Sequence, residues 1–317
     1  MTDLQIRKIP FDFDGDVPFL WNPHNPEFAI MCNAVGVLAI AFEKFVVATV
    51  KKAMPLITDP EVRAEADAFM RQEGQHARMH RAHITSLIRK YPGVQQTLDE
   101  AVAAFDELLE TKPVEFNLAY TANLEATFTP IFKLFLDHHK TLYEPGDDRV
   151  ASLFIWHFVE EVEHRSSALV LYREVVGSER ARFRMLPEIF GHVIKVYAGA
   201  VRSFDEVIPA EDRMIDGTRA LPSRMYRREI GIRLPWFKKR ILAEDGHGTA
   251  LQDASAGELI RMAIGLVKSQ VPGHDPTHQP LPAFADEWFA AYDEGREVAT
   301  WYASSRAAAN SPIAEVA

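Results

Sequence analysis

Apolar residues recur with helical spacing along most of this chain, and runs that alternate like a strand are almost absent. The pattern predicts helices over residues 29–54, 58–90, 97–143, 149–176 and 179–207, with further helices near 255–270 and 284–303. Thr58 or Asp59 can cap the second helix ahead of Pro60, and Gly177 stops the fourth. A bend or break is expected near Pro113. The sequence therefore predicts an all-α protein.

The periodicity and composition divide the chain into four parts. We expect an N-terminal extended segment over residues 1–28 and a helical bundle over residues 29–207. After residue 207, Pro, Gly and charged residues increase, which predicts a C-terminal helical extension over residues 208–303 packed on the bundle. We expect residues 304–317 to form a disordered tail.

Composition limits the classes of partner and compartment. The formal net charge of -10 argues against nucleic acid, and the single cysteine, Cys32, excludes an intramolecular disulfide and a thiolate metal site. The first residues lack the apolar stretch of a signal peptide, so we expect a soluble cytoplasmic protein. Residues 29–50 approach membrane-span length, but Glu43 and Lys44 interrupt them. A helix at the centre of a bundle is also apolar all round, so we expect no stable membrane insertion.

The fourth predicted helix contains the stretch WHFVEEVEH, residues 156–164, which places three glutamates and two histidines between apolar runs. At 100° per residue, His157, Glu161 and His164 lie within an arc of about 60°. On the second helix, Glu73, His76 and His80 share an arc of the same width. Isolated carboxylates are costly in an apolar interior, so these groups should be paired, metal-bound or solvated.

The order of these residues along the chain is more informative than any single motif. A single Glu-x-x-His motif is weak evidence for a metal site, since a chain of this length contains about one by chance. Here Glu43, then Glu73 with His76, then Glu125, then Glu161 with His164 each fall on a separate predicted helix. This is the di-metal carboxylate arrangement of ferritin-like four-helix bundles. Taken singly, each residue has a simpler explanation, such as a salt bridge for Glu43.

Charge supports the same hypothesis. Four converging glutamates carry about four negative charges, which two divalent cations would cancel. The predicted ligands are Glu43, Glu73, His76, Glu125, His157, Glu161 and His164, with Glu73 and Glu161 as bridges. His157 is either a seventh ligand, which we favour, or an outer hydrogen-bond donor. His80 is either a further ligand or, as we favour, an outer hydrogen-bond partner. Glu160 is either an outer hydrogen-bond partner or the partner of Arg165 in a salt bridge.

Four stretches resemble a known bacterial family. FEKFV (42–46), RQEGQHARMHRAH (71–83), NLEATFT (123–129) and WHFVEEVEHRSSALVLY (156–172) are similar to the blocks of proteins described as predicted metal-dependent hydrolases, over roughly residues 5–280. The first block departs from the pattern, with Phe42 before the glutamate and Lys44 after it. The resemblance implies a ferritin-like fold and a metal site. The spacing of His157, Glu161 and His164 also resembles that of di-iron arylamine N-oxygenases.

The ligand chemistry leaves three functions open. Carboxylate and imidazole ligands without sulfur suit iron, which we favour, or manganese. We expect a di-iron enzyme that activates O2 to oxidise a small organic substrate, with an electron-donor protein as a further partner. The alternatives are a metal-dependent hydrolase and non-catalytic iron binding and oxidation as in ferritin. Phe42, Phe128 and Phe158 could line a substrate pocket, although core packing is the simpler role. Base rates predict a homodimer.

Overall fold

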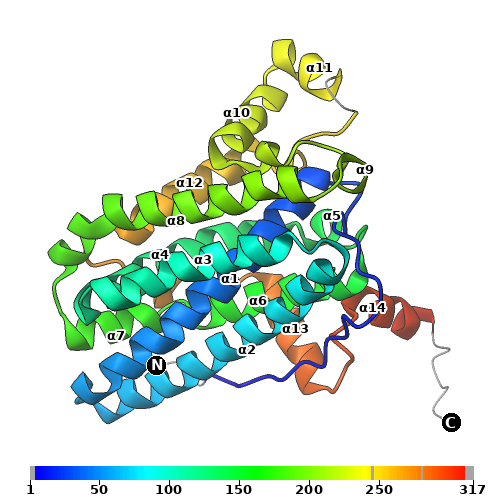
Figure 1. Cartoon of the computed structure of the whole chain (residues 1–317). Coiled ribbons are helices and arrows are strands. Elements are labelled where there is room, and N and C mark those ends of the chain that lie inside the picture. Colours follow the sequence, from blue (N-terminus) through cyan, green and yellow to red (C-terminus); the bar gives the residue numbers. More distant parts are fainter. Residues whose placement is uncertain (1–3, 244–245, 280, 311–317) are drawn as a thin grey trace, which may run out of the picture.

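The computed structural model describes residues 4–243, 246–279 and 281–310, apart from the side chains of residues 278 and 307–310. Within these ranges the chain forms α-helices and three short 3-10 helices and no β-strand, which confirms the all-α prediction (Figure 1). The α-helices are α1 (Pro26–Ala53), α2 (Pro60–Lys90), α3 (Val94–Thr111), α4 (Val114–Asp137), α5 (His139–Leu142), α6 (Asp148–Glu163), α7 (Ser167–Val175), α8 (Glu179–Val207), α9 (Ala210–Arg213), α10 (Pro222–Arg233), α11 (Pro235–Ala243), α12 (Ala256–Gln270), α13 (Ala283–Asp293) and α14 (Trp301–Asn310).

The first two helices begin at capping residues. The Asn25 side chain accepts a hydrogen bond from the Phe28 N–H, so α1 begins at Pro26, three residues before the predicted start. The Asp59 carboxylate accepts from the N–H groups of Glu61 and Val62 at the start of α2. Of the two predicted capping residues, Asp59 therefore takes this role.

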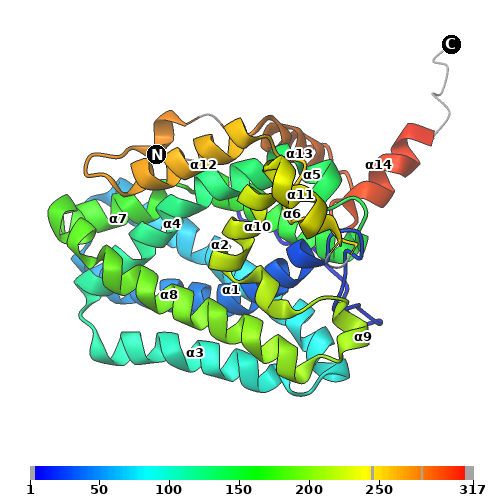
Figure 2. The same cartoon turned by 90° about the horizontal axis from the view of Figure 1, so that it is seen from above.

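Four helices pack around the centre of the molecule. α1 lies against α2, α4 lies against α6, and contacts of α1 with α4 and of α2 with α6 close the group. α3 joins α2 to α4 and packs on α1 and α8 along one side, as the view from above shows (Figure 2). These four helices carry the candidate ligands.

Among the described residues, one helical span is long and apolar enough to cross a membrane. It is Pro26–Leu56, which consists of α1 and the 3-10 turn after it. In its most apolar window, 78% of the residues are buried inside the protein. The apolar side chains of α1 therefore contact other helices, as those of a central core helix do.

Three predicted helices are interrupted. The helix predicted over 284–303 is two helices, α13 and α14, with residues 294–300 between them. The region 97–143 breaks at Pro113, as predicted, because proline disfavours a helical residue before it and here caps α4. The predicted fourth helix is in fact two helices, α6 and α7, and the prediction of one continuous helix to residue 176 is wrong. The chain turns at residues 164–167, where the Ser167 N–H donates to the His164 carbonyl. The Arg165 guanidinium donates to the Val162 carbonyl, which a continuing helix would have used.

The C-terminal part covers the outer side of α4. α12 lies directly on α4, where a Cβ at Gly265 would come within 2.8 Å of the Pro130 ring. α13 also contacts α4, and α14 packs on α6. The predicted disordered tail is wrong for residues 304–310, because α14 extends to Asn310 and the hydroxyls of Ser304 and Ser305 donate to the Trp301 carbonyl. Residues 311–317 lie outside the described residues.

Candidate metal centre

The structure brings all seven predicted ligands together in the interior. α1 contributes Glu43, α2 contributes Glu73 and His76, and α4 contributes Glu125. His157 and Glu161 lie on α6, and His164 is the residue that ends it. None of these seven residues exposes more than 4% of its surface. The site is therefore enclosed by protein.

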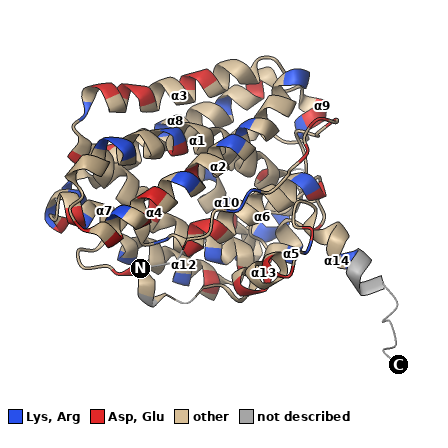
Figure 3. Cartoon of the chain, turned by 90° about the horizontal axis from the view of Figure 1, so that it is seen from below, with Lys and Arg blue, Asp and Glu red and all other residues tan. Residues whose placement is uncertain are grey.

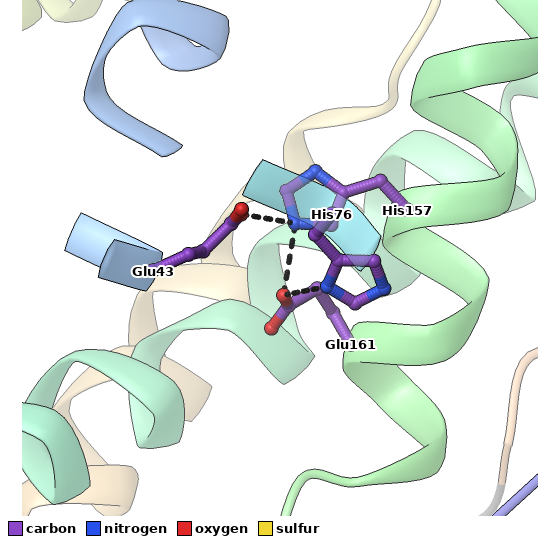
Figure 4. A group of neighbouring side chains, drawn as sticks. All are labelled: Glu43, His76, His157 and Glu161. Atoms are coloured by element: carbon purple, nitrogen blue, oxygen red, sulfur yellow. Dashed lines mark hydrogen bonds and ion pairs between the residues drawn. The ribbon is translucent and has the colours of Figure 1, made fainter. Parts of the chain in front are cut away.

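The first of two donor clusters consists of Glu43, His76, His157 and Glu161, which point toward one another from α1, α2 and α6 (Figure 4). The Nε2 atom of His157 lies 3.1 Å from Glu43 Oε1 and 2.9 Å from Glu161 Oε1. The Nδ1 atom of His76 lies 3.5 Å from the same Glu161 oxygen. Two carboxylates and two imidazoles thus converge on one small volume.

The second cluster consists of Glu73, Glu125, Glu161 and His164. The Nε2 atom of His164 lies 3.2 Å from Glu73 Oε1, 3.5 Å from Glu125 Oε2 and 3.2 Å from Glu161 Oε2. In each cluster the donor atoms lie within 4.8 Å of one another. Glu161 turns one oxygen toward each cluster, which is the geometry of a carboxylate that bridges two ions.

Several donor atoms in the two clusters lack a hydrogen-bond partner within the protein. They are Oε2 of Glu43, both carboxylate oxygens of Glu73 and of Glu125, and Nδ1 of His76. A buried polar atom without a partner is costly, and native proteins rarely leave one so. These atoms belong to residues of the two clusters, and they are oxygen and nitrogen donors of the types that bind divalent iron, manganese or zinc. The residues present therefore fit two divalent cations.

The electrostatics of the site without metal lead to the same conclusion. Burial, together with the carboxylates of Glu73, Glu161 and Glu125, raises the pKa of Glu43 well above its usual value. Burial and the neighbouring Glu161 raise the pKa of Glu73 to about 7. Burial also raises the pKa of Glu125 well above its usual value. Three of the four glutamates therefore resist ionisation until positive charge is supplied.

The fourth glutamate behaves differently. Burial acts to raise the pKa of Glu161, but His164, followed by His157 and His76, outweighs it and holds the pKa well below its usual value. Burial would lower the pKa of His76, yet its contacts with Glu160 and Glu161 raise it to about 9. Without metal, imidazole protons thus supply part of the positive charge that cations would bring.

Outer hydrogen bonds fix which nitrogen of His76 and of His164 faces the clusters. His76 Nε2 donates to Glu160 at 2.9 Å, and Glu160 accepts from the Arg7 guanidinium at 3.0 Å. His164 Nδ1 donates to the Gln72 side-chain oxygen at 3.0 Å. The nitrogens left facing the clusters are His76 Nδ1 and His164 Nε2, an arrangement common around metal-binding histidines.

Arg7 joins these outer contacts into one network. Its guanidinium binds both oxygens of Glu163, at 2.8 and 2.9 Å, and Gln72 Nε2 donates to Glu163 at 2.9 Å. The alternative partner of Glu160, Arg165, instead donates to backbone carbonyls. Sequence analysis missed Arg7 and Gln72. Gln72 directly precedes Glu73, but nothing in the N-terminal segment marks Arg7 as a partner of α6.

His80 contacts a residue of the first cluster. His80 Nε2 lies 2.7 Å from His157 Nδ1, so His157 can present Nε2 to the first cluster while donating its Nδ1–H to His80. Glu125 makes no hydrogen bond with the two threonines that follow it, because the Thr127 hydroxyl donates to the Leu124 carbonyl and the Thr129 hydroxyl has no hydrogen-bond partner.

Aromatic rings lie beside His157 of the first cluster. Phe42 meets Phe128 edge-on, and Phe158 stacks on Phe132 with ring centroids 3.9 Å apart. The His157 ring centroid lies 6.3 Å from that of Phe132. These rings form a water-poor wall, which strengthens electrostatic interactions inside the site.

The comparisons with known proteins assign a family. Residues 5–230 match the family model described as predicted metal-dependent hydrolase. The match covers well over half of the chain, and the chain belongs to this family. No curated protein and no solved structure matches it significantly. The family description and the two buried clusters agree on a metal-dependent protein.

Proposed function

We propose that the protein is a metal-dependent enzyme whose centre is a pair of divalent ions inside a ferritin-like four-helix bundle. α1 with α2, and α4 with α6, would form its two helix pairs, each supplying one glutamate and one Glu-x-x-His. The observation that carries the proposal is the set of buried, unpartnered donor atoms in two clusters that share Glu161.

The seven predicted ligands have separate tasks in this proposal. Glu161 would hold both ions, while Glu43, His76 and His157 complete one site and Glu73, Glu125 and His164 the other. Arg7 and Glu160 hold the His76 ring in the orientation that directs Nδ1 inward. Four glutamates and two divalent cations sum to zero charge, so the loaded interior would carry no net charge from them.

Hydrolysis is the reaction class that the family description favours, ahead of the O2 chemistry that the sequence analysis placed first. Two bound divalent ions would supply Lewis acidity toward a substrate oxygen and activate a water molecule. Within the protein, the aromatic wall beside His157 would exclude bulk water.

Oxidation with O2 is the second candidate, and a specific observation favours it. The donor set is four glutamates and three histidines buried among helices, with at most 4% exposure, so a small apolar gas reaches it more easily than a polar ester does. With iron, the centre would supply electrons to O2, and turnover would need an electron-donor protein.

One experiment separates the two reactions. Metal-free protein is loaded anaerobically with ferrous iron, exposed to O2 and followed by visible absorption, and parallel samples loaded with manganese or zinc are assayed on nitrophenyl esters and phosphodiesters. Ester or phosphodiester turnover that the variant Glu161→Ala abolishes supports hydrolysis. Oxidation of bound iron by O2 without any hydrolysis would contradict the hydrolase proposal and support oxidation with O2. Neither activity in a protein that binds iron supports non-catalytic iron binding.

A further inference from the structure

α10 and α11 expose an unusual number of large apolar side chains. Trp236 is 89% exposed, Tyr226 68% and Phe237 51%, and Ile230 and Leu234 are each 44% exposed. Tyr226 and Ile230 are four residues apart on one face of α10, and Leu234 follows its last residue, ahead of Trp236 on α11. A contiguous apolar surface of this kind marks an interaction site.

The opposite side of the two helices is anchored to the protein. Ile232 and Ile241 are buried, and Gly231 lets α11 approach α10 so closely that a Cβ there would lie 2.6 Å from Ile241. Glu229 accepts hydrogen bonds from the Thr249 hydroxyl and the Leu251 N–H. The helices therefore hold the apolar face outward instead of burying it.

The same segment is strongly basic in an acidic protein. Residues 222–243 contain seven Lys or Arg and one acid, Glu229, whereas the whole chain carries a formal charge of -10. Lys238 and Lys239 are exposed beside Trp236, and Glu229 is buried in a salt bridge with Arg233. Two acids at 244 and 245 follow and lie outside the described residues. The outer face of α10–α11 is thus both apolar and basic.

The position of the segment suits docking on a flat surface. α10 and α11 lie at the outer edge of the molecule, with α11 farthest from α1 and α2 (Figure 1). On the opposite side, seen from below, acidic and basic residues are interspersed along the helices (Figure 3). The exposed rings of Trp236 and Phe237 and the exposed Lys238 and Lys239 thus lie together on α11.

We propose that the α10–α11 surface, formed by Tyr226, Ile230, Leu234, Trp236, Phe237, Lys238 and Lys239, docks on an anionic lipid membrane. Tryptophan and aliphatic side chains enter the headgroup region, and lysines beside them bind anionic lipids. The charge argues against a second copy, because a two-fold contact would bring two basic surfaces together. This inference goes beyond the proposed function and does not depend on the metal centre.

Tryptophan fluorescence of the full-length protein tests the proposal directly. The chain has five tryptophans, all among the described residues, and the other four, Trp21, Trp156, Trp288 and Trp301, are buried. We expect the emission to shift to shorter wavelength when vesicles of equal parts phosphatidylglycerol and phosphatidylcholine are added. Vesicles of phosphatidylcholine alone should give little shift, and added salt should weaken binding.

Matched variants separate docking from general charge effects. The pair Lys238→Glu and Lys239→Glu should lower vesicle binding at least about tenfold. The control pair Lys51→Glu and Lys52→Glu, also adjacent and exposed, should bind like the parent. Trp236→Phe should abolish the spectral shift while cosedimentation with vesicles remains, and circular dichroism should show unchanged helicity in all variants.

Three results would overturn the inference. The first is no cosedimentation with anionic vesicles. The second is an equal loss of binding in both lysine pairs. The third is that the protein does not bind vesicles but forms a concentration-dependent dimer, which Trp236→Ala disrupts. A second copy of the chain would then be the occupant of this surface.

Discussion

Arg7 shows how much of the site depends on residues outside the candidate ligands. It is 4% exposed, it binds Glu160 and Glu163, and its guanidinium lies 4.5 Å from the centroid of the Phe289 ring on α13. Through Glu160 it orients His76, and through Glu163 and Gln72 it orients His164. One arginine thus acts on a histidine of each cluster.

Replacing Arg7 should weaken metal binding at both clusters. We expect Arg7→Met to lower the affinity for divalent metal by about 10- to 100-fold, because the histidines lose the partners that fix their orientation. Titration calorimetry with manganese measures the change. Arg296→Met is the matched control, since Arg296 also stacks on an aromatic ring, that of Trp301, but donates a hydrogen bond to the Trp301 carbonyl and not to a residue of the metal site. Equal losses in the two variants would contradict the positioning role of Arg7.

Metal binding should also depend on pH with a defined sign. Without metal, the pKa of Glu73 is raised to about 7 and that of His76 to about 9, so both hold protons that a metal must displace. Affinity should therefore fall as the pH is lowered from about 8 to about 6, and binding at neutral pH should release protons. Calorimetry in two buffers with different ionisation enthalpies measures this release. Proton uptake, or an affinity independent of pH, would contradict it.

At the scale of the helices, the sequence predicted what periodicity and capping determine. The positions of α1, α2, α8 and α12, the break at Pro113 and the common faces of the candidate ligands follow from local spacing. The helices α10 and α11 were not predicted. A carbonyl at the end of α6 accepts from Arg165, whose other partners include carbonyls at 276 and 279, more than 100 residues along the chain. The approach of Arg7 to α6 is likewise a tertiary contact, and local spacing carries no signal for either.

The packing of α12 on α4 gives a prediction at this scale. Gly265→Ala should destabilise the protein by about 1–3 kcal/mol, because the new Cβ would meet the rigid Pro130 ring. Gly191→Ala, in α8, has open space and should stabilise it by about 0.4–1 kcal/mol. Urea unfolding of both variants at a fixed metal concentration measures the difference. A stabilising Gly265→Ala would show that α12 can move away from α4 at little cost.

For the whole molecule, the buried charge couples folding to metal. Four glutamates meet in the interior, and three of them have raised pKa values there, so the metal-free fold bears an electrostatic cost. The sequence predicted this convergence from order and phase alone. Where each proton and each ring nitrogen lies could not be predicted, because that depends on Glu160, Gln72 and His80 in three dimensions.

Metal should therefore raise thermal stability. At a free metal concentration about 100-fold above the dissociation constant, one site contributes about 2.7 kcal/mol to the free energy of unfolding. We expect a chelator to lower Tm and added metal to restore it. Glu163→Gln should retain more of this response than Glu161→Ala, since Glu163 acts on the clusters only through Arg7 and Gln72, whereas Glu161 belongs to both. A Tm that neither the chelator nor metal changes would argue against a metal centre.

The central claim is a dinuclear centre that shares Glu161, and metal stoichiometry tests it most directly. Metal-free protein is saturated with manganese or anaerobic ferrous iron, freed of excess ion and analysed for metal content, beside Glu161→Ala and Glu163→Gln. Two ions per chain are expected for the parent and for Glu163→Gln, and a loss of both ions or a large drop in occupancy is expected for Glu161→Ala. A parent that retains no ion, or a Glu161→Ala variant that still holds two, would contradict the account.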